Sequence, residues 1–247
     1  MNFQHRVTVM GSGSFGTVLA NIVAHNGFPV SLWLRDQYLA EEMRQTRVNS
    51  RYVPGLYLHD DLEIVTDFKR CVSHADTLIF SVPSKAFRGV LEQVKDFIND
   101  QQFLVTTAKG IEPDHFLLMS QLLEVYFPKN PIGVVSGPNL AKEVAAKQLT
   151  GTVIASDNEG LRQQVQALLQ CDFFRVYASN DPYGTELGGA LKNIYAIAAG
   201  LSAAMGMGEN TRSMLLTRSL AEMSRLAVHM GANPMTFLGL AGVGDLI

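Results

Sequence analysis

The stretch Gly11-Ser12-Gly13-Ser14-Phe15-Gly16 decides the expected fold of this chain. An apolar run at residues 6–10 precedes it and is typical of a buried strand. Residues 15–26 follow with the periodicity of a helix that stops at Gly27. In such a unit the first glycine permits a tight turn, the second lets the backbone approach a pyrophosphate, and the third lets helix pack on strand. The stretch therefore predicts a dinucleotide-binding loop, with a purely structural turn as the alternative.

The end of the next apolar run bears on which dinucleotide is bound. Residues 30–34 read as a second strand, and Arg35 and Asp36 follow directly. An acidic residue at this place binds the ribose 2′-hydroxyl of NAD, whereas an arginine accommodates the 2′-phosphate of NADP. Because Arg35 comes first, the sequence favours NADP over NAD. An Arg35 that only reaches into solvent remains the alternative.

Strands and helices continue to alternate through the first two thirds of the chain. A helix over 84–97 is expected to be capped by Ser84. Further strand-like runs lie at residues 77–82, 103–106, 132–135, 152–155 and 174–177. This alternation predicts right-handed crossovers and helices on both faces of one sheet. The expected class is α/β, with a Rossmann-like, mostly parallel, doubly wound sheet.

The pattern changes at Asp181-Pro182. An aspartate cap before a proline at the first helical position is a strong start signal. Helical periods follow at 183–204 and 209–230, without a convincing strand. Within them, the helix is expected to bury Ile194, Ile197 and Ala198, and the apolar run it contains is too short to span a membrane.

Two domains are therefore expected. The first, over residues 1–181, is the dinucleotide-binding domain. The second, over residues 182–247, is the start of an all-α substrate domain that is incomplete at Ile247.

Composition excludes several functional classes. The 20 Lys and Arg against 23 Asp and Glu give a net charge of −3, which leaves no basic excess for binding nucleic acid. Cys71 and Cys171 form no CxxC pair and are expected to be reduced thiols, as in a cytoplasmic protein. The six histidines show no metal-ligand spacing, so no metal site is expected.

Three polar clusters follow strands, at residues 81–84, 106–110 and 136–141. Ligands bind open α/β sheets at the carboxyl edge, where these clusters should meet. Lys109 precedes Gly110 and is expected to sit on a turn that points into the crevice; a plain surface lysine is the alternative. The segment Gly137-Pro138-Asn139 is expected to open a helix.

The segment Glu186-Leu187-Gly188-Gly189-Ala190-Leu191-Lys192-Asn193 has an unusual composition for a helix. Each Gly inside a helix costs about 1 kcal/mol, so another part of the chain should approach the backbone closely there. Lys192, on an apolar helix, either reaches to solvent or acts chemically. A desolvated lysine beside another cation can serve as a general base.

Taken together, these residues resemble the bacterial NAD(P)-dependent glycerol-3-phosphate dehydrogenases. The resemblance spans the chain in order, and its combination of motifs is specific. It is carried by the stretch at 11–16, Val82-Pro83-Ser84, Lys109-Gly110, Ser136-Gly137-Pro138-Asn139-Leu140-Ala141-Lys142-Glu143, Gly189-Ala190-Leu191-Lys192-Asn193 and Gly242-Val243-Gly244-Asp245-Leu246.

The resemblance implies a reversible hydride transfer between NAD(P)H and dihydroxyacetone phosphate, which supplies glycerol 3-phosphate for phospholipid synthesis, in a homodimer. It implies dinucleotide contacts from Gly11, Gly13, Ser14, Phe15, Gly16, Arg35, Lys109 and Ala141. It implies substrate contacts from Lys109, Gly137, Asn139, Lys192, Asn193 and Asp245, with Lys192 as proton acceptor. The family continues into a Ser-Arg-Asn stretch beyond the Gly-Asp-Leu segment. Another two-domain hydroxy-acid dehydrogenase and a dinucleotide-binding protein without turnover are the alternatives.

Overall fold

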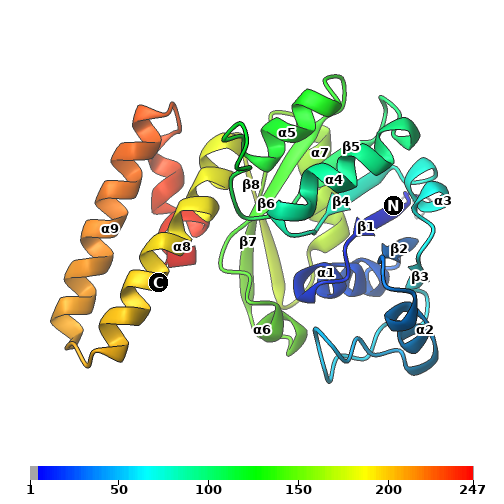
Figure 1. The fold of residues 1–247 in the computed structure, drawn as a ribbon, viewed down its shortest axis with the longest axis horizontal. Helices are drawn as coiled ribbons and strands as arrows, with labels where there is room; N and C mark the ends of the chain where they lie inside the picture. Colours follow the sequence, from blue (N-terminus) through cyan, green and yellow to red (C-terminus); the bar gives the residue numbers. More distant parts are fainter. Residues whose placement is uncertain (1–4, 247) are drawn as a thin grey trace.

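An eight-stranded sheet forms the larger part of the structure, a computed structural model that describes residues 5–246 (Figure 1). Its strands lie in the order β3-β2-β1-β4-β5-β6-β7-β8. Their bounds are β1 (Val7–Met10), β2 (Val30–Trp33), β3 (Glu63–Val65), β4 (Thr77–Phe80), β5 (Phe103–Thr106), β6 (Ile132–Ser136), β7 (Thr150–Ala155) and β8 (Phe174–Ser179). All neighbours pair in parallel except β6 and β7, where the direction reverses.

Helices cover both faces of this sheet, as the alternating pattern predicts. Their bounds are α1 (Ser14–His25), α2 (Gln37–Thr46), α3 (Phe68–Ser73), α4 (Ser84–Val94), α5 (Met119–Tyr126), α6 (Ala141–Ala145), α7 (Glu159–Leu169), α8 (Pro182–Ala204) and α9 (Glu209–His229). Apolar side chains of α1, α2, α6 and α7 form one core cluster, and those of α3, α4 and α5 form another. The mostly parallel, doubly wound sheet expected from the sequence is confirmed.

Two local expectations differ from the structure. Ser84 is the first residue of α4 rather than its cap, because Pro83 holds the N-cap position with extended backbone and no side-chain hydrogen bond is made there. The segment Gly137-Pro138-Asn139 does not open a helix either, since α6 begins only at Ala141.

The short strand β3 has few apolar residues that would mark it in the sequence, and Glu63 is exposed. It is recognised as a strand by its pairing with β2.

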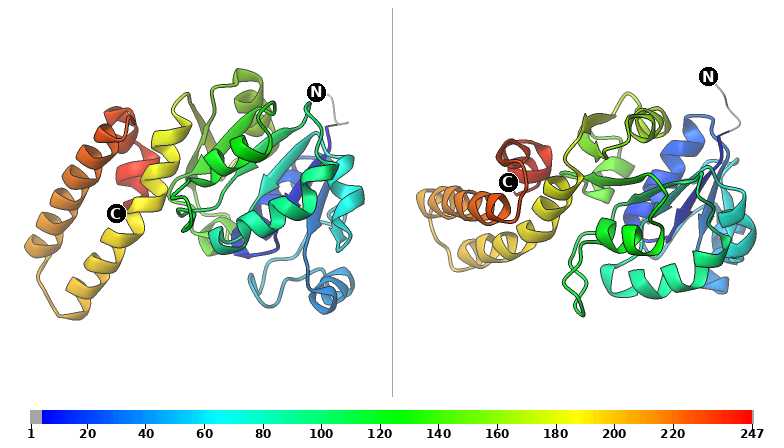
Figure 2. Two further views of the ribbon diagram at one scale, coloured as in Figure 1. Left: turned by 45° about the horizontal axis from the view of Figure 1, so that its top comes forward. Right: turned by 90° about the horizontal axis from the view of Figure 1, so that it is seen from above.

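The helices α8 and α9 stand beside the sheet as an antiparallel pair (Figures 1 and 2). Asp181 caps α8 by accepting a hydrogen bond from the Gly184 N–H at 2.8 Å, and Pro182 is the first helical residue, as predicted. Short helical segments, Pro234–Leu238 and Leu240–Gly244, follow α9 and return the chain to α8.

The far half of α8 is not buried, which corrects the sequence-based expectation. Ile194 is 64% exposed and Ile197 is 72% exposed, whereas Leu187 and Leu191 are buried. Only the first half of α8 lies against the sheet, at β6 and β7, and the second half contacts α9 along one side. The apolar run therefore marks one solvent-facing side of a helix pair.

Two further features concern the chain as a whole. Within residues 5–246, no helix has the length and apolarity needed to cross a membrane. Cys71 and Cys171 are both free thiols, as expected.

Candidate active site

The strand order reverses between β1 and β4, and the first of the polar clusters, at residues 81–84, follows β4 at this place. A cavity of about 890 Å³ opens there. Its walls come from the loops that follow β1, β2, β3 and β4, and from one side of α4. A hollow of this size at a reversal of strand order is the usual place for a dinucleotide in an open α/β sheet.

The glycines of the 11–16 loop have three different surroundings, in the order that the motif predicts. Gly11 has a φ of +115°, and a Cβ on it would lie 2.6 Å from the Ser81 carbonyl oxygen. A Cβ on Gly16 would lie 2.1 Å from the Gly11 carbonyl oxygen, so α1 can pack on β1 only with glycine there. Gly13 faces open space, with no atom within 4 Å of the position of its Cβ. The loop therefore leaves room for a phosphate group at the start of α1.

Two arginines line the cavity beyond the end of β2. Arg35 is exposed and lies in the wall, as its position in the sequence predicts. Arg51, from the loop after α2, pairs with Asp36 at 2.9 Å. The Leu39 N–H and the Arg51 guanidinium hold the pKa of Asp36 below its usual range. Asp36 is thus engaged by α2 and Arg51, which leaves Arg35 as the cation at the strand tip.

The remaining expected dinucleotide contacts lie around α1. The Ser14 hydroxyl donates to the Tyr52 carbonyl oxygen at 3.0 Å, which ties the loop after α2 to the glycine loop. Phe15 and Ala141 are half-buried and pack against the core cluster that α1 and α6 share.

Lys109 follows β5 on the turn that its neighbour Gly110 permits. Gly110 has a φ of +145°, and a Cβ on it would meet the Ser84 hydroxyl at 2.8 Å. The Lys109 ammonium donates to the Gly137 carbonyl oxygen at 3.2 Å. The loops after β5 and β6 therefore converge, and the stem of Lys109 lies close to Gly189 on α8.

Asp245 joins the two lysines that the sequence singles out. One carboxylate oxygen accepts from Lys109 and the other from Lys192, and the Asp245 carbonyl oxygen accepts from Lys192 at 3.1 Å. The Asp245 side chain is only 3% exposed. Burial lowers the pKa of Lys109 despite the attraction of Asp245, and the nearby Lys192 lowers it further. The three groups form one partly buried cluster, which we call the Lys109–Asp245–Lys192 cluster.

The Gly188-Gly189 pair brings α8 close to this cluster. A Cβ on Gly188 would lie 2.6 Å from the Ala241 carbonyl oxygen. A Cβ on Gly189 would lie 2.6 Å from the Ser136 hydroxyl and 3.8 Å from the Lys109 stem. The close approach expected from two adjacent glycines is confirmed: Ala241 approaches the backbone at Gly188, and Ser136 and Lys109 approach it at Gly189.

Polar atoms without partners lie at the end of β6. Among the described residues, the Ser136 hydroxyl oxygen and the Asn139 amide oxygen are buried and make no hydrogen bond. The Asn139 amide nitrogen donates to the Thr152 hydroxyl at 2.9 Å. Asn193 lies exposed on α8 beside Lys192. Buried polar atoms without partners fit a site that receives a polar molecule.

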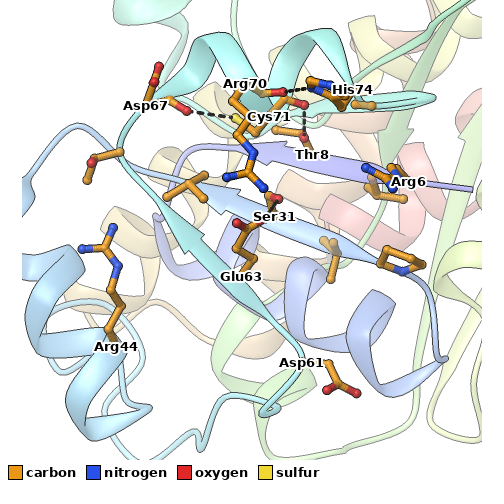
Figure 3. A pocket seen from close by; sticks show the side chains of 16 residues that line it. Arg6, Thr8, Ser31, Arg44, Asp61, Glu63, Asp67, Arg70, Cys71 and His74 are labelled. Carbon is orange, nitrogen blue, oxygen red and sulfur yellow. Dashed lines mark hydrogen bonds between the residues drawn. The ribbon is translucent and has the colours of Figure 1, made fainter.

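A second hollow, of about 500 Å³, lies at the opposite edge of the sheet beside α3 (Figure 3). Its wall carries three arginines and three acidic side chains, so its charges balance. Arg70 extends from α3 toward Ser31 and Glu63, and the Ser31 hydroxyl donates to Glu63 at 2.7 Å. It shares no residue with the glycine loop or with the Lys109–Asp245–Lys192 cluster.

Family models match most of the chain. The model of the NAD-dependent glycerol-3-phosphate dehydrogenase N-terminus matches residues 6–162, and that of the C-terminus matches residues 181–247. The chain belongs to this dehydrogenase family. A glycerol-3-phosphate dehydrogenase [NAD(P)+] of Pseudomonas putida is 56% identical over 247 residues, which are 100% of this chain and 72% of that protein. The corresponding protein of Alcanivorax borkumensis is 54% identical, over 99% of this chain and 71% of its own.

Solved structures of the glycerol-3-phosphate dehydrogenase family have the same fold. A crystal structure of the enzyme from Coxiella burnetii superposes with a TM-score of 0.94 at 36% identity, and the match covers 99% of this chain and 75% of that one. The enzyme from Saccharomyces cerevisiae superposes with a TM-score of 0.88 at 27% identity, over 98% and 76% of the two chains.

Sequence reasoning missed two residues with clear structural roles at this site. Arg51 lies in a loop without periodicity, so only the fold brings it to Asp36. Glu186 is buried and accepts hydrogen bonds from the first turn of α5. It belongs to the glycine-pair segment, but the sequence pattern gives it no role of its own. A lone carboxylate within an apolar helix is the signal that could have found it.

Proposed function

We propose that this chain catalyses reversible hydride transfer between NAD(P)H and dihydroxyacetone phosphate, giving glycerol 3-phosphate for phospholipid synthesis. The observation that carries this proposal is the Lys109–Asp245–Lys192 cluster at the carboxyl edge of the sheet. Two cations beside unpartnered polar atoms suit a small anionic substrate with a reacting oxygen. Membership of the family supplies the reaction type.

The residues around the glycine loop suit a dinucleotide. The open space at Gly13 and the N–H groups at the start of α1 would hold the pyrophosphate, with Ser14 and Phe15 beside it. Arg35 would face a 2′-phosphate, which favours NADP. When bound, the nicotinamide supplies or accepts the hydride. Lys109, in the loop after β5, and Ala141, at the start of α6, would contact the same cofactor.

In this proposal Lys192 is the proton acceptor. In the oxidation direction it takes the proton of the substrate hydroxyl, and in the reduction direction it returns that proton to the carbonyl oxygen. Asp245 fixes the direction of the Lys192 ammonium through two hydrogen bonds. Lys109 holds the same substrate oxygen or its neighbour.

The remaining substrate contacts come from three backbone or amide groups. Gly137 and Asn139 lie on the loop after β6, and Asn193 lies beside Lys192 on α8. The Asn139 amide oxygen, which has no protein partner among the described residues, would accept from a substrate hydroxyl.

The domain organisation belongs to the same proposal. Residues 1–181 form the dinucleotide-binding domain, and residues 182–247 belong to the helical substrate domain. The Lys109–Asp245–Lys192 cluster would then lie between them, since Lys109 comes from the first and its two partners from the second. A homodimer in the cytoplasm completes the proposal.

A spectrophotometric assay tests the function. The chain should consume NADPH, and more slowly NADH, when dihydroxyacetone phosphate is added, and a panel of 2-keto acids should give far lower rates. Preference for a keto acid would indicate another hydroxy-acid dehydrogenase. Cofactor binding by calorimetry without any change in nicotinamide absorbance would indicate a binding protein without turnover.

A further inference from the structure

Glu186 lies in the second turn of α8 and is only 2% exposed. Its Oε1 accepts hydrogen bonds from the Met119 N–H at 2.8 Å and from the Ser120 N–H at 3.2 Å. Its Oε2 accepts from the Ser120 N–H at 3.2 Å and from the Ser120 hydroxyl. These contacts all go to the first turn of α5.

The first turn of α5 needs such an acceptor. The initial N–H groups of a helix have no partner within the helix, and an anion there is stabilised by the helix dipole. Leu118 holds the N-cap position of α5, and its side chain has no acceptor atom. The Gln121 side chain satisfies only the Leu118 N–H, at 3.0 Å. Glu186 therefore supplies the cap of α5 from a distant helix.

The start of α5 also closes the loop that begins at Lys109. Ile111 and Leu118 pair as an antiparallel bridge across this loop. Inside the bridge, the Glu112 N–H donates to the Leu117 carbonyl oxygen at 2.8 Å. Holding the first turn of α5 in place therefore fixes the far end of the loop, and the bridge carries that constraint back to Lys109.

On α8, Gly189 and Lys192 follow Glu186 at successive intervals of three residues, so each is a neighbour of the next on the helix surface, and Lys192 lies about 120° around the axis from Glu186. Gly189 lies close to the Ser136 hydroxyl and to the aliphatic part of the Lys109 side chain. At a rise of about 1.5 Å per residue, Lys192 lies roughly 9 Å along the helix axis from Glu186. A shift of α8 at Glu186 would therefore displace Lys192 from Asp245.

We propose that Glu186 is a positioning residue for the reaction: by capping α5 from α8, it fixes Lys192 relative to Lys109 and Asp245. The proposal rests on the proposed function. Glu186 touches neither substrate nor cofactor in this scheme, and it acts on the rate through the placement of the two lysines.

The test compares Glu186→Gln with Glu159→Gln in the full chain. The introduced glutamine keeps the shape of the glutamate side chain but turns an N–H₂ group toward the N–H groups of α5. A misplacement of about 1 Å can cost roughly 10²-fold in rate, so kcat of Glu186→Gln should fall by about that factor with NADPH affinity unchanged. Glu159 is exposed in the first turn of α7 and accepts a hydrogen bond from Gln163 on the same helix. Glu159→Gln makes the same chemical change away from α5 and α8, and it should leave kcat near the parental value.

A pH series separates positioning from a purely structural role. Burial raises the pKa of Glu186 to about 7, against the hydrogen bonds from Ser120 and Met119, and the nearby Glu124 on α5 raises it further. A protonated glutamate resembles glutamine, so the ratio of parental to Glu186→Gln kcat should fall toward one below about pH 7. A ratio that is constant with pH would overturn the proposal.

Chemical labelling of the lysines tests, without any need for turnover, whether Glu186 fixes the position of Lys192. An amine-acylating reagent, followed by peptide mass spectrometry, should modify Lys192 faster in Glu186→Gln than in the parental chain. The rate of Lys192 modification in Glu159→Gln should equal the parental rate. If the parental chain consumes no NADPH, the proposed function fails while this labelling still decides the role of Glu186. Unchanged labelling of Lys192, or unchanged kcat in an active chain, would refute the positioning role.

Discussion

The sheet and the α8–α9 pair use apolar residues in opposite ways. Strands such as β4 are covered by helices on both faces, and Leu78 at its centre is completely buried. The far half of α8 carries Ile194 and Ile197 on a solvent-facing side. The boundary runs through α8 itself, because most residues of its first half, from Gly184 to Leu191, are buried between the sheet, α9 and the helical segments that follow α9. The chemical groups lie at this boundary: Lys109 comes from the sheet and Lys192 from the helix pair.

The largest effect should come from the helix side of the boundary, at Lys192. A positioned base contributes about 10²–10⁴-fold in rate, so Lys192→Ala should lower kcat by that order with NADPH affinity near the parental value. Lys192→Arg should fail as well, because a guanidinium does not release its proton near neutral pH. Steady-state kinetics and calorimetry measure both quantities.

Lys129→Ala is the matched control, since Lys129 is exposed and pairs with Asp100 at the surface. A Lys192→Ala chain that turns over at a rate near that of the control would end the assignment of Lys192 as the proton acceptor.

The next effect tests the difference in burial directly. Leu78→Ala should lower the free energy of unfolding by about 2–5 kcal/mol, because it leaves a cavity in a fully packed core. Ile197→Ala, at a side chain that is 72% exposed, should change it by no more than about 0.5 kcal/mol. Urea unfolding of the two variants measures both values. Similar losses would show that the outer side of α8 is covered in solution.

A smaller effect is expected at the cavity beside β2. Arg35→Ala should weaken NADPH binding by roughly 1.5–3 kcal/mol relative to NADH, because only NADPH carries the 2′-phosphate. Arg6→Ala provides the control, since Arg6 lines the hollow at the opposite edge of the sheet (Figure 3). Titration calorimetry with both cofactors is the measurement. Equal losses of affinity for NADPH and NADH would mean that Arg35 does not bind the 2′-phosphate.

The smallest effect is a change of the free energy of unfolding with pH, which arises from Glu186 at the contact between α5 and α8. Burial raises the pKa of Glu186 in the folded chain to about 7, above its ordinary value of 4.5. The folded state therefore holds this proton more tightly than the unfolded state, and stability should decrease as pH rises from about 4.5 to 7. Urea unfolding between pH 5 and 8 should show this decrease in the parental chain, and Glu186→Gln should lack that component. If the free energy of unfolding changes with pH identically in both chains, a group other than Glu186 is responsible for the change.

Local signals in the sequence by themselves determined much of this protein. The glycine spacing at 11–16 between a strand and a helix predicted the loop and its close contacts. This was possible because the conformation or close packing that requires each glycine is set largely by neighbouring parts of the strand–loop–helix unit. The Asp181-Pro182 start signal predicted the beginning of α8 for the same reason. Lys109 and the Gly188-Gly189 pair were also recognisable, since their neighbours restrict the local backbone.

Only the tertiary structure decided how these parts meet. Lys109 and Asp245 are 136 residues apart, and no local pattern indicates that one carboxylate serves two lysines. The cap that Glu186 gives to α5 is equally non-local. The exposure of Ile197 was also decided there, because burial depends on which element covers a helix face, and an apolar run is compatible with either outcome. Such contacts follow from strand order and from how closely α8 approaches the sheet, and both are set by packing over the whole chain.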